Sequence, residues 1–468
     1  MMTSVVVGLG KTGASCLRYF ARRGIAAAAT DSRAAPPGLE ELGGLASSID
    51  IRLGRFDLSL LDGATQLLMS PGVSLEEPIA TEARARGIPV LGDIELFARA
   101  ARAPVIGVTG TNGKSTVTSL VAHMAAAAGR RVLAGGNLGR PALDLLEEPV
   151  PDLYVLELSS FQLETTSSLE LAAAVVLNVT ADHMDRYPSI EAYAQAKARI
   201  FARAASVVLN ADDPCVSAMR RTALASAAVG TPPRIVTFSV ARTDADFTVA
   251  RRGSGVWLSR SGKAVLDSAR MKISGLHNVA NALAALALGE AAGLPMAAML
   301  GALETFPGLK HRSEFVADIA GVRYVNDSKG TNVGAAIAAV AGLEGPLVLI
   351  AGGEGKGQNF APLAAAFRDK VRRVVLIGKD APALDAALAG VCPTERAATL
   401  PDAVRAAAAA ARPGDTVLLS PACASLDMFR DYNHRGEVFA ASVRALGSAA
   451  AFGSAAAPDG TAPPGGAA

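Results

Sequence analysis

The segment PVIGVTGTNGKST at 104–116 constrains the fold more than any other part of the sequence. An apolar run typical of a buried strand passes into a glycine-rich turn and then into a helical pattern. Such a turn lets backbone N–H groups converge on a phosphate at a helix N-terminus, where the helix dipole favours negative charge. Lys114 would reach the transferred phosphate, and the Ser115 hydroxyl would coordinate Mg²⁺. We therefore expect an α/β domain with a mainly parallel sheet that binds ATP.

This loop departs from the generic phosphate-binding pattern at one position. The pattern G-x-x-x-x-G-K-[ST] requires glycine where the chain has Val108. The pattern T-G-T-N-G-K-S is more specific than the generic one, because it fixes more of the residue types in the loop. An expected strand precedes it and an expected helix follows it. The residues expected to bind ATP are Gly110, Thr111, Asn112, Gly113, Lys114, Ser115 and Thr116.

Two further apolar runs end in residues that can bind a metal. Glu157 ends DLYVLEL, and the loop that follows AAAVVLNV carries His183. Sites in open α/β sheets lie beyond the carboxyl ends of strands, and Mg²⁺ prefers a few oxygen donors, so Glu157 and Ser115 form a predicted magnesium site. His183 by itself fits a structural or surface histidine equally well. Lys197, in AYAQAKARI, has the pattern of a solvated helix lysine.

A similar strand, turn and helix begin the chain. The run VVVGLGKTG contains G-x-G-x-x-G at 8–13, and Asp31 ends the next expected strand. Alone, this pattern suggests a nicotinamide dinucleotide, but the same geometry serves any diphosphate.

The length of 468 residues suits about three domains. Strand–helix alternation recurs along each third of the chain, which predicts an α/β protein with a Rossmann-like N-terminal domain, a central P-loop ATPase-like domain and a Rossmann-like C-terminal domain. We place these domains at 1–93, 94–305 and 306–447. The remaining residues, 448–468, are mostly glycine, alanine and proline without periodicity, and we expect them to be disordered.

Composition excludes several classes of partner. The formal net charge is +2, so no global field favours nucleic acid or an acidic membrane. The most apolar helical stretch, 281–300, is interrupted by Gly293 and Pro295, so we expect no membrane insertion. The four cysteines form no C-x-x-C pair, and the N-terminus lacks the features of a signal peptide. A cytoplasmic protein is expected.

A set of short motifs occurs in one order between residues 104 and 430. They are TGTNGKST, ELSSFQLE, NVTADHMDRY, AYAQAKARI, GLHNVANALAA, FPGLKHR, NDSKGTN, AGGEGKG and LLSPACASLDMF. Together they resemble the Mur ligase family, and the first domain extends the resemblance to nearly the whole chain except its tail. NDSKGTN and SPACASLDMF resemble most closely the members that add D-glutamate to UDP-N-acetylmuramoyl-L-alanine. The resemblance implies an ATP-dependent, amide-forming ligase of peptidoglycan precursor synthesis, acting as a monomer.

The resemblance also implies roles for single residues around ATP. Lys197 would be carbamylated by CO₂, and the resulting carbamate would hold a second Mg²⁺ together with His183. Asn278 and Asn281 would contact adenine, and Asp327 the nucleotide. The residues implied in catalysis are Lys114, His183, Lys197 and Arg312, and those implied in metal binding are Ser115, Glu157, His183 and Lys197.

The two outer domains would bind the other substrates. The residues implied for D-glutamate are Lys329, Thr331, Lys356, Ser425, Leu426 and Tyr432. Those implied for the uridine diphosphate part of the precursor are Lys11, Thr12, Asp31, Ser32, Arg33, Ser70 and Gly72, with Asn137 and His183 at its muramoyl-alanine end. Two positions depart from the family pattern, since Glu354 and Tyr432 stand where we expect Asp and Phe.

Several alternatives share parts of this pattern. Another Mur ligase step or a folate polyglutamate synthase would use the same ATP-binding residues and differ in the outer domains. A nicotinamide oxidoreductase would explain only 8–13. A nucleotide-gated binding module would bind ATP without turnover.

Overall fold

The computed structural model describes residues 3–137, 139–225, 232–253 and 255–454. The chain divides into two compact units, Met1–Pro307 and Gly308–Ala468, and each is described by itself. The predicted boundary near residue 93 lies within the first unit and stays a prediction. No helix in the described ranges is long and apolar enough to cross a membrane.

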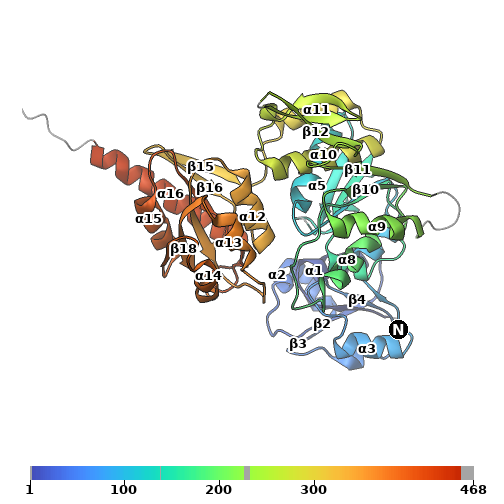
Figure 1. The fold of residues 1–468 in the computed structure, drawn as a ribbon. Helices are drawn as coiled ribbons and strands as arrows, with labels where there is room; N and C mark the ends of the chain where they lie inside the picture. Colours follow the sequence, from blue (N-terminus) through green and yellow to red (C-terminus); the bar gives the residue numbers. More distant parts are fainter. Residues whose placement is uncertain (1–2, 138, 226–231, 254, 455–468) are drawn as a thin grey trace, which may run out of the picture. The chain divides into compact units, whose positions relative to one another are not determined.

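The first unit begins with a five-stranded parallel sheet in the order β3-β2-β1-β4-β5. Its strands β2, β3 and β4 are labelled in Figure 1. Its strands are short and mostly apolar, as parallel strands covered by helices usually are. They are β1 (Thr3–Val7), β2 (Ala27–Asp31), β3 (Asp50–Leu53), β4 (Ala64–Met69) and β5 (Val90–Leu91). The helices are α1 (Lys11–Arg22), α2 (Gly38–Leu42) and α3 (Pro78–Ala85).

A nine-stranded sheet follows in the same unit, in the order β14-β13-β12-β11-β10-β9-β6-β8-β7. Its strands are β6 (Val105–Thr109), β7 (Val132–Gly136), β8 (Leu153–Glu157), β9 (Ala173–Val176), β10 (Ser206–Asn210), β11 (Arg234–Phe238), β12 (Phe247–Arg252), β13 (Gly255–Arg260) and β14 (Lys263–Asp267). Its helices are α4 (Asp93–Ala100), α5 (Lys114–Ala127), α6 (Ala142–Leu145), α7 (Ser160–Glu164), α8 (Ile190–Ala198), α9 (Pro214–Ala225), α10 (Leu276–Ala291) and α11 (Met296–Thr305). The strands from β7 to β12 pair in parallel, whereas β12, β13 and β14 form an antiparallel extension that the sequence did not predict.

The second unit contains a six-stranded sheet in the order β15-β16-β20-β17-β18-β19. All its strand pairs are parallel except β15 with β16. Its strands are β15 (Glu314–Ile319), β16 (Val322–Asn326), β17 (Leu347–Gly352), β18 (Val371–Ile377), β19 (Thr394–Arg396) and β20 (Thr416–Leu419). Its helices are α12 (Val333–Gly342), α13 (Pro362–Phe367), α14 (Ala381–Leu388), α15 (Leu400–Ala410) and α16 (Tyr432–Ser454).

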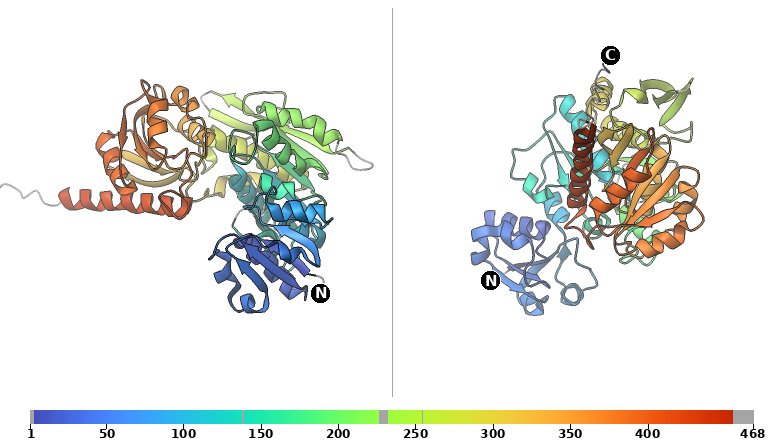
Figure 2. Two further views of the ribbon diagram at one scale, coloured as in Figure 1. Left: turned by 90° about the horizontal axis from the view of Figure 1, so that it is seen from below. Right: turned by 90° about the vertical axis from the view of Figure 1, so that its left-hand side faces the viewer.

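Helices cover both faces of this last sheet. Side chains of α12, α13 and α14 form one apolar core with the strands, and side chains of α15 and α16 form the other. The two helices α15 and α16 lie side by side (Figure 2). This doubly wound arrangement is the Rossmann-like architecture expected for the C-terminal domain.

The predicted fold class is confirmed, with one difference near the end of the chain. The helix α16 extends to Ser454, so residues 448–454, which we expected to be disordered, are helical. The rest of the predicted tail, 455–468, lies outside the described residues.

Candidate active site

The loop between β6 and α5 is held by the segment that follows β9. The backbone N–H of Asn112 donates to Asn178 Oδ1 at 2.8 Å, and Asn178 Nδ2 donates to the Asn112 carbonyl at 3.1 Å. Thr111 N–H donates to the Asn178 carbonyl at 2.9 Å. The loop therefore has a fixed shape at the N-terminus of α5, which begins at Lys114. This is the geometry that binds phosphate.

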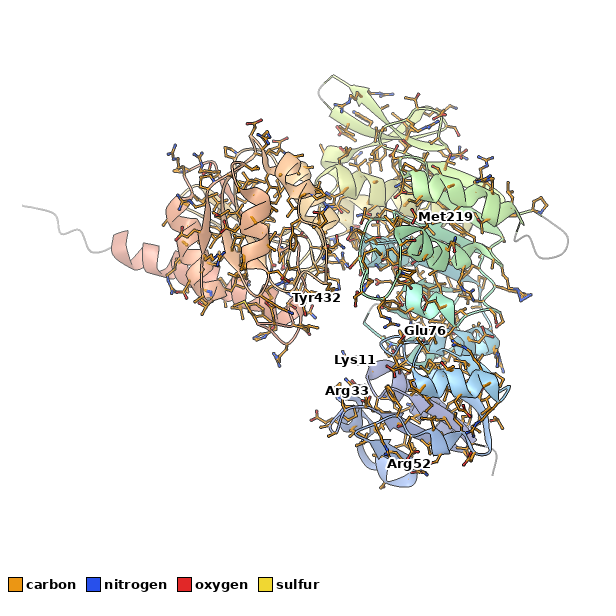
Figure 3. All side chains as sticks on the ribbon, turned by 60° about the horizontal axis from the view of Figure 1, so that its bottom comes forward. Lys11, Arg33, Arg52, Glu76, Met219 and Tyr432 are labelled. Atoms are coloured by element: carbon orange, nitrogen blue, oxygen red, sulfur yellow. The ribbon has the colours of Figure 1, made fainter. Side chains whose placement is uncertain are left out.

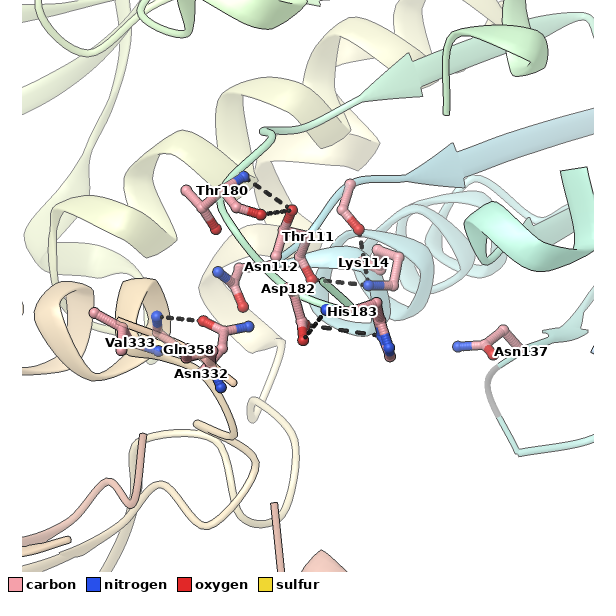
Figure 4. A network of polar contacts seen from close by, with 12 residues as sticks. Thr111, Asn112, Lys114, Asn137, Thr180, Asp182, His183, Asn332, Val333 and Gln358 are labelled. Atoms are coloured by element: carbon pink, nitrogen blue, oxygen red, sulfur yellow. Dashed lines mark hydrogen bonds and ion pairs between the residues drawn. The ribbon is translucent and has the colours of Figure 1, made fainter. Parts of the chain in front are cut away.

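The Lys114 ammonium group lies over this loop (Figure 4). Its Nζ donates to the carbonyls of Gly110 and Thr111, both at 2.8 Å. Ser115 and Thr116, the next two residues, are buried in the first turn of α5. The positive charge and the helix N-terminus thus lie at the same end of the central sheet.

Lys197 is buried, with only 1% of its surface exposed. Its Nζ donates to the Gly110 carbonyl at 3.0 Å and lies 4.2 Å from the centre of the Tyr193 ring. Burial, together with the nearby Lys114 charge, lowers the pKa of Lys197 well below its usual value, while Asp182 and Glu157 oppose the shift. The local sequence favours a solvated lysine on a helix at this position, and that interpretation is wrong.

The two carboxylate oxygens of Glu157, at the end of β8, have different surroundings. Its Oε1 accepts a hydrogen bond of 2.6 Å from Asn137 Nδ2. Its Oε2 is buried and has no hydrogen-bond partner within the described part of the chain. A buried carboxylate oxygen without a donor costs free energy unless a cation meets it, so this side chain fits a metal ligand.

His183 lies in an aromatic cluster after β9. Its backbone has φ of 58°, and its ring packs edge-on against Phe161 with 5.0 Å between ring centres. Its Nε2 lies 3.9 Å from Asp182 Oδ2 (Figure 4). Among the described residues, no three His, Cys, Asp or Glu side chains form a metal-binding group. The predicted donor set contains only two such residues, Glu157 and His183.

The first turns of α10 approach the phosphate loop. Asn278 Nδ2 donates to the Ser274 carbonyl at 2.8 Å, and Asn281 Nδ2 donates to Asn278 Oδ1 at 3.2 Å. Gly113 has φ of 86°, and a Cβ there would lie 2.5 Å from Asn281 Oδ1. Glycine is therefore required at this turn, and both asparagines lie beside the predicted ATP site.

A pocket of about 670 Å³ opens beside the first sheet. Lys11 and Arg33 line it from the N-terminal domain and lie near each other in Figure 3. It brings together the predicted precursor residues Lys11, Thr12, Asp31, Ser32, Arg33, Ser70, Gly72 and Asn137. His183 is not among its lining residues.

Asp31 organises the wall of this pocket. Its carboxylate accepts hydrogen bonds from Leu9 N–H at 2.6 Å and from the Arg33 guanidinium at 2.7 and 2.9 Å. Burial acts to raise the pKa of Asp31, but these hydrogen bonds outweigh it and leave the pKa below its usual value. Because both oxygens are occupied, Asp31 is poorly placed to hold a nicotinamide ribose.

The pocket also contains residues that the sequence did not single out. Gln162 lines it and donates to Asp93 Oδ2 at 3.2 Å. Arg186 lines it with its guanidinium 4.6 Å from the centre of the Phe161 ring. Both belong to motifs quoted above, ELSSFQLE and NVTADHMDRY, but nothing in their spacing separates them from surface residues.

In the second unit, Asp327 follows β16. Its Oδ2 accepts from the Ser420 hydroxyl at 2.7 Å, and its Oδ1 accepts from Ser313 N–H at 3.1 Å. Burial raises the pKa of Asp327 to about 6 against these hydrogen bonds and the Arg312 charge.

The residues predicted for glutamate lie in loops at the carboxyl ends of β16, β17 and β20, except Tyr432, which begins α16. Lys329 Nζ lies 3.7 Å from the centre of the Tyr432 ring (Tyr432 is labelled in Figure 3), and Thr331 N–H donates to the Lys329 carbonyl. Lys356 has φ of 51°. Ser425 is buried, whereas Leu426 is 68% exposed.

Comparisons with known proteins agree with this architecture. Three family models match: the Mur ligase MurD-like N-terminal domain at residues 2–92, the Mur ligase middle domain at 108–289 and the Mur ligase glutamate ligase domain at 311–423. The crystal structure of UDP-N-acetylmuramate-alanine ligase MurC from Thermotoga maritima has the same fold, with a TM-score of 0.61 and 20% identity over 95% of this chain and 100% of that one.

Relatives in sequence cover almost the whole chain. A protein named UDP-N-acetylmuramoylalanine--D-glutamate ligase from Nitrosococcus oceani is 53% identical over 95% of this chain and 97% of its own. Proteins of the same name from Methylococcus capsulatus and Pseudomonas aeruginosa are 51% and 49% identical, each over 94% of this chain and over 94% and 98% of their own. This chain belongs to the Mur ligase family.

Proposed function

We propose that the chain is an ATP-dependent ligase that joins D-glutamate to UDP-N-acetylmuramoyl-L-alanine in the synthesis of peptidoglycan precursors. The observation that carries the proposal is the identity of about half of all residues, over nearly full length, with relatives that bear the name of this activity. The geometry of the phosphate loop, the buried lysine and the pocket beside the first sheet supports the same chemistry.

The pocket of the first unit suits the nucleotide precursor. Lys11, next to the glycine-rich turn and the start of α1, supplies charge for a diphosphate. Asp31 and Arg33 hold each other in a fixed geometry at the wall where the uridine end would lie. Asn137 links this pocket to the catalytic region, because its side chain lines the pocket and also binds Glu157.

The residues present fit Mg²⁺ ions. Glu157 offers a buried oxygen that no donor among the described residues meets, and Ser115 lies buried in the first turn of α5. In this proposal Ser115 and Glu157 hold one Mg²⁺, while His183 and a carbamate on Lys197 hold a second. When bound, these ions neutralise the charge that develops on the transferred phosphoryl group.

Burial of Lys197 supports the carbamate. An uncharged amine is the nucleophile toward CO₂, and the low pKa of Lys197 favours that form. A bond forms between Nζ and the carbon of CO₂, one N–H proton leaves to water, and the product is an anion. The nearby Lys114 charge, which disfavours an ammonium group at Lys197, favours this anion.

The reaction has two steps. The alanine carboxylate of the precursor attacks the γ-phosphorus of ATP in line, which gives an acyl phosphate and ADP. The uncharged amine of glutamate then attacks the acyl carbon, and the tetrahedral intermediate collapses to the amide with loss of phosphate and a proton. Lys114 and Arg312 supply positive charge during the first step, while Asn278, Asn281 and Asp327 position the nucleotide.

The loops of the second unit bind D-glutamate in this proposal. Lys329 and Lys356 provide cations for the two carboxylates, and Thr331 and Ser425 provide hydroxyl groups. Tyr432 packs against the Lys329 ammonium group and orients it.

The test is ATP-dependent phosphate release by the purified protein with UDP-N-acetylmuramoyl-L-alanine and one amino acid at a time. Release that requires both the precursor and D-glutamate is expected. Release with L-lysine or diaminopimelate instead would assign another step of the same pathway. ATP binding without release under any of these conditions would refute ligase activity, and size-exclusion chromatography would test the expected monomer.

A further inference from the structure

Arg435, on the first turn of α16, is fully buried with 0% of its surface exposed. Its guanidinium donates to the Ser328 hydroxyl at 3.0 Å and the Ser328 carbonyl at 2.8 Å. It also donates to the carbonyls of Cys423 at 3.1 Å and Ala424 at 3.3 Å. All these acceptors are neutral, and no carboxylate in the described ranges accepts a hydrogen bond or forms an ion pair with it.

This side chain stays charged although it is buried. Burial lowers the pKa of Arg435 to about 10, which still lies far above neutral pH. An apolar side chain of similar volume would fill the same space without the cost of desolvating a cation. The guanidinium therefore supplies a positive charge and several hydrogen-bond donors, which an apolar side chain of the same size would not supply.

The partners of Arg435 belong to the loops predicted to bind glutamate. Ser328 directly precedes Lys329, and Ala424 directly precedes Ser425. The Ser328 hydroxyl also donates to the Tyr432 carbonyl at 2.8 Å, which joins the start of α16 to the loop after β16.

A third loop is connected through Ala424. Glu354 N–H donates to the Ala424 carbonyl at 3.0 Å, and Ala424 N–H donates to the Glu354 carbonyl at 2.8 Å. The Ala424 carbonyl thus accepts from both Arg435 and the loop after β17, which carries Lys356. One buried side chain holds the ends of β16 and β20 together and reaches the end of β17 through a single shared acceptor.

We infer that Arg435 is a positioning residue of the amino-acid pocket, whose guanidinium fixes the loops of Lys329 and Ser425 and favours an acidic amino acid through its buried positive charge. The inference rests on the proposed function and extends it to selectivity. Electrostatic attraction acts at longer range in a poorly solvated interior than in water, so a buried cation whose hydrogen-bond acceptors are neutral raises the local potential for an anionic substrate. The nearby charges of Asp327 and Asp427 oppose only part of this effect, because neither carboxylate forms an ion pair with Arg435 in the described ranges. A neutral amino acid gains nothing from this field.

The test compares Arg435→Lys and Arg435→Gln with the wild-type chain. Lysine keeps the charge but loses the planar fork of donors, and glutamine loses the charge. The Michaelis constants for D-glutamate, ATP and the precursor are measured separately, with D-glutamine as a competing neutral amino acid. We expect Arg435→Gln to raise the constant for D-glutamate at least tenfold and those for ATP and the precursor less than twofold. Arg435→Lys should fall between Arg435→Gln and the wild type.

The preference for D-glutamate over D-glutamine separates this role from simple support of the fold. The ratio of the Michaelis constant for D-glutamine to that for D-glutamate should fall at least fivefold in Arg435→Gln and by a smaller factor in Arg435→Lys. If both amino acids weaken equally, or if the constant for D-glutamate is unchanged, the inference is overturned. A matched control is Arg444→Gln, because Arg444 is an exposed arginine later in the same helix.

A second variant covers the case in which the Arg435 variants do not fold. Ser328→Ala removes one acceptor of the guanidinium and the donor to the Tyr432 carbonyl, with a small change in volume. It should raise the Michaelis constant for D-glutamate several-fold, and an unchanged constant would overturn the inference. Absence of D-glutamate dependence in the wild-type chain would instead refute the proposed function itself.

Discussion

Substitution of Gly353 by alanine should weaken the second unit far more than the same change at Gly357. Gly353 has φ of 132°, and a Cβ there would overlap the Ala424 carbonyl oxygen. Gly357 has φ of 70°, but no atom lies within 4 Å of a Cβ placed there. The two positions thus share an unfavourable backbone angle and differ in the steric overlap.

The expected free energies follow from this difference. A positive φ costs a residue with a side chain about 1–2 kcal/mol. Overpacking adds about 1–3 kcal/mol, and displacement of Ala424 loses the hydrogen bond from Glu354 N–H, worth about 1 kcal/mol. Gly353→Ala should therefore cost about 3–6 kcal/mol of unfolding free energy, and Gly357→Ala about 1–2 kcal/mol.

Hydrogen–deuterium exchange measures this cost within one unit. Amides of β17 and β20 should lose protection in Gly353→Ala, while those of β6 in the first unit serve as an internal reference. The single tryptophan of the chain, Trp257, lies in β13, so its fluorescence follows the first unit only. Equal loss of protection in the two variants would refute the steric argument, because only the backbone angle would then matter.

Three further predictions concern the proposed chemistry. Lys197→Ala should lower the rate of phosphate release about a thousandfold, equal to about 4 kcal/mol, and short carboxylic acids should partly restore it; unchanged turnover would contradict the carbamate. Glu157→Gln should raise the Mg²⁺ concentration for half-maximal activity at least about tenfold, and an unchanged Mg²⁺ titration would contradict its role as a ligand. Asp327 holds its proton more tightly in the folded state, so wild-type stability should fall by up to about 3 kcal/mol as the pH rises from about 4 through about 6. Asp327→Asn should lack this fall in urea unfolding, and equal pH dependence of the two proteins would contradict the raised pKa.

Much of the fold could be predicted because its central strands are continuous apolar runs. Three of these strands, β6, β8 and β17, are buried along their whole length. Each is followed by residues whose types favour a turn. The antiparallel extension was missed because β12 and β13 mix arginines with apolar residues and are only partly buried. Ser261 and Gly262, both with positive φ, form a two-residue hairpin loop between β13 and β14, and this Ser-Gly pair was a usable signal.

Some residues of the site could likewise be placed from the neighbouring sequence, whereas the placement of others depends on segments far away in the chain. The phosphate loop is a continuous segment, so its shape follows from its own glycines and the helix behind it. The burial of Lys197 depends on strands and loops far away in the chain, and its helix alone gives no sign of it. The Ala424 carbonyl accepts hydrogen bonds from both Arg435 and the Glu354 N–H. The contact with Glu354 joins distant parts of the chain, so the sequence around Ala424 does not predict it.

The two fully buried cations of the chain, within its described ranges, differ in the property that their proposed roles require. Burial and the nearby Lys114 charge lower the pKa of Lys197 well below its usual value, which favours the uncharged amine. Arg435 loses some basicity to burial but remains charged with a pKa of about 10. A carbamate can form only on an uncharged amine, whereas a field that favours an acidic amino acid needs a permanent cation. Lysine at 435 would keep a positive charge but lose the planar fork of donors that reaches both Ser328 and Ala424, and arginine at 197 would offer CO₂ no nucleophile, so neither side chain fully replaces the other.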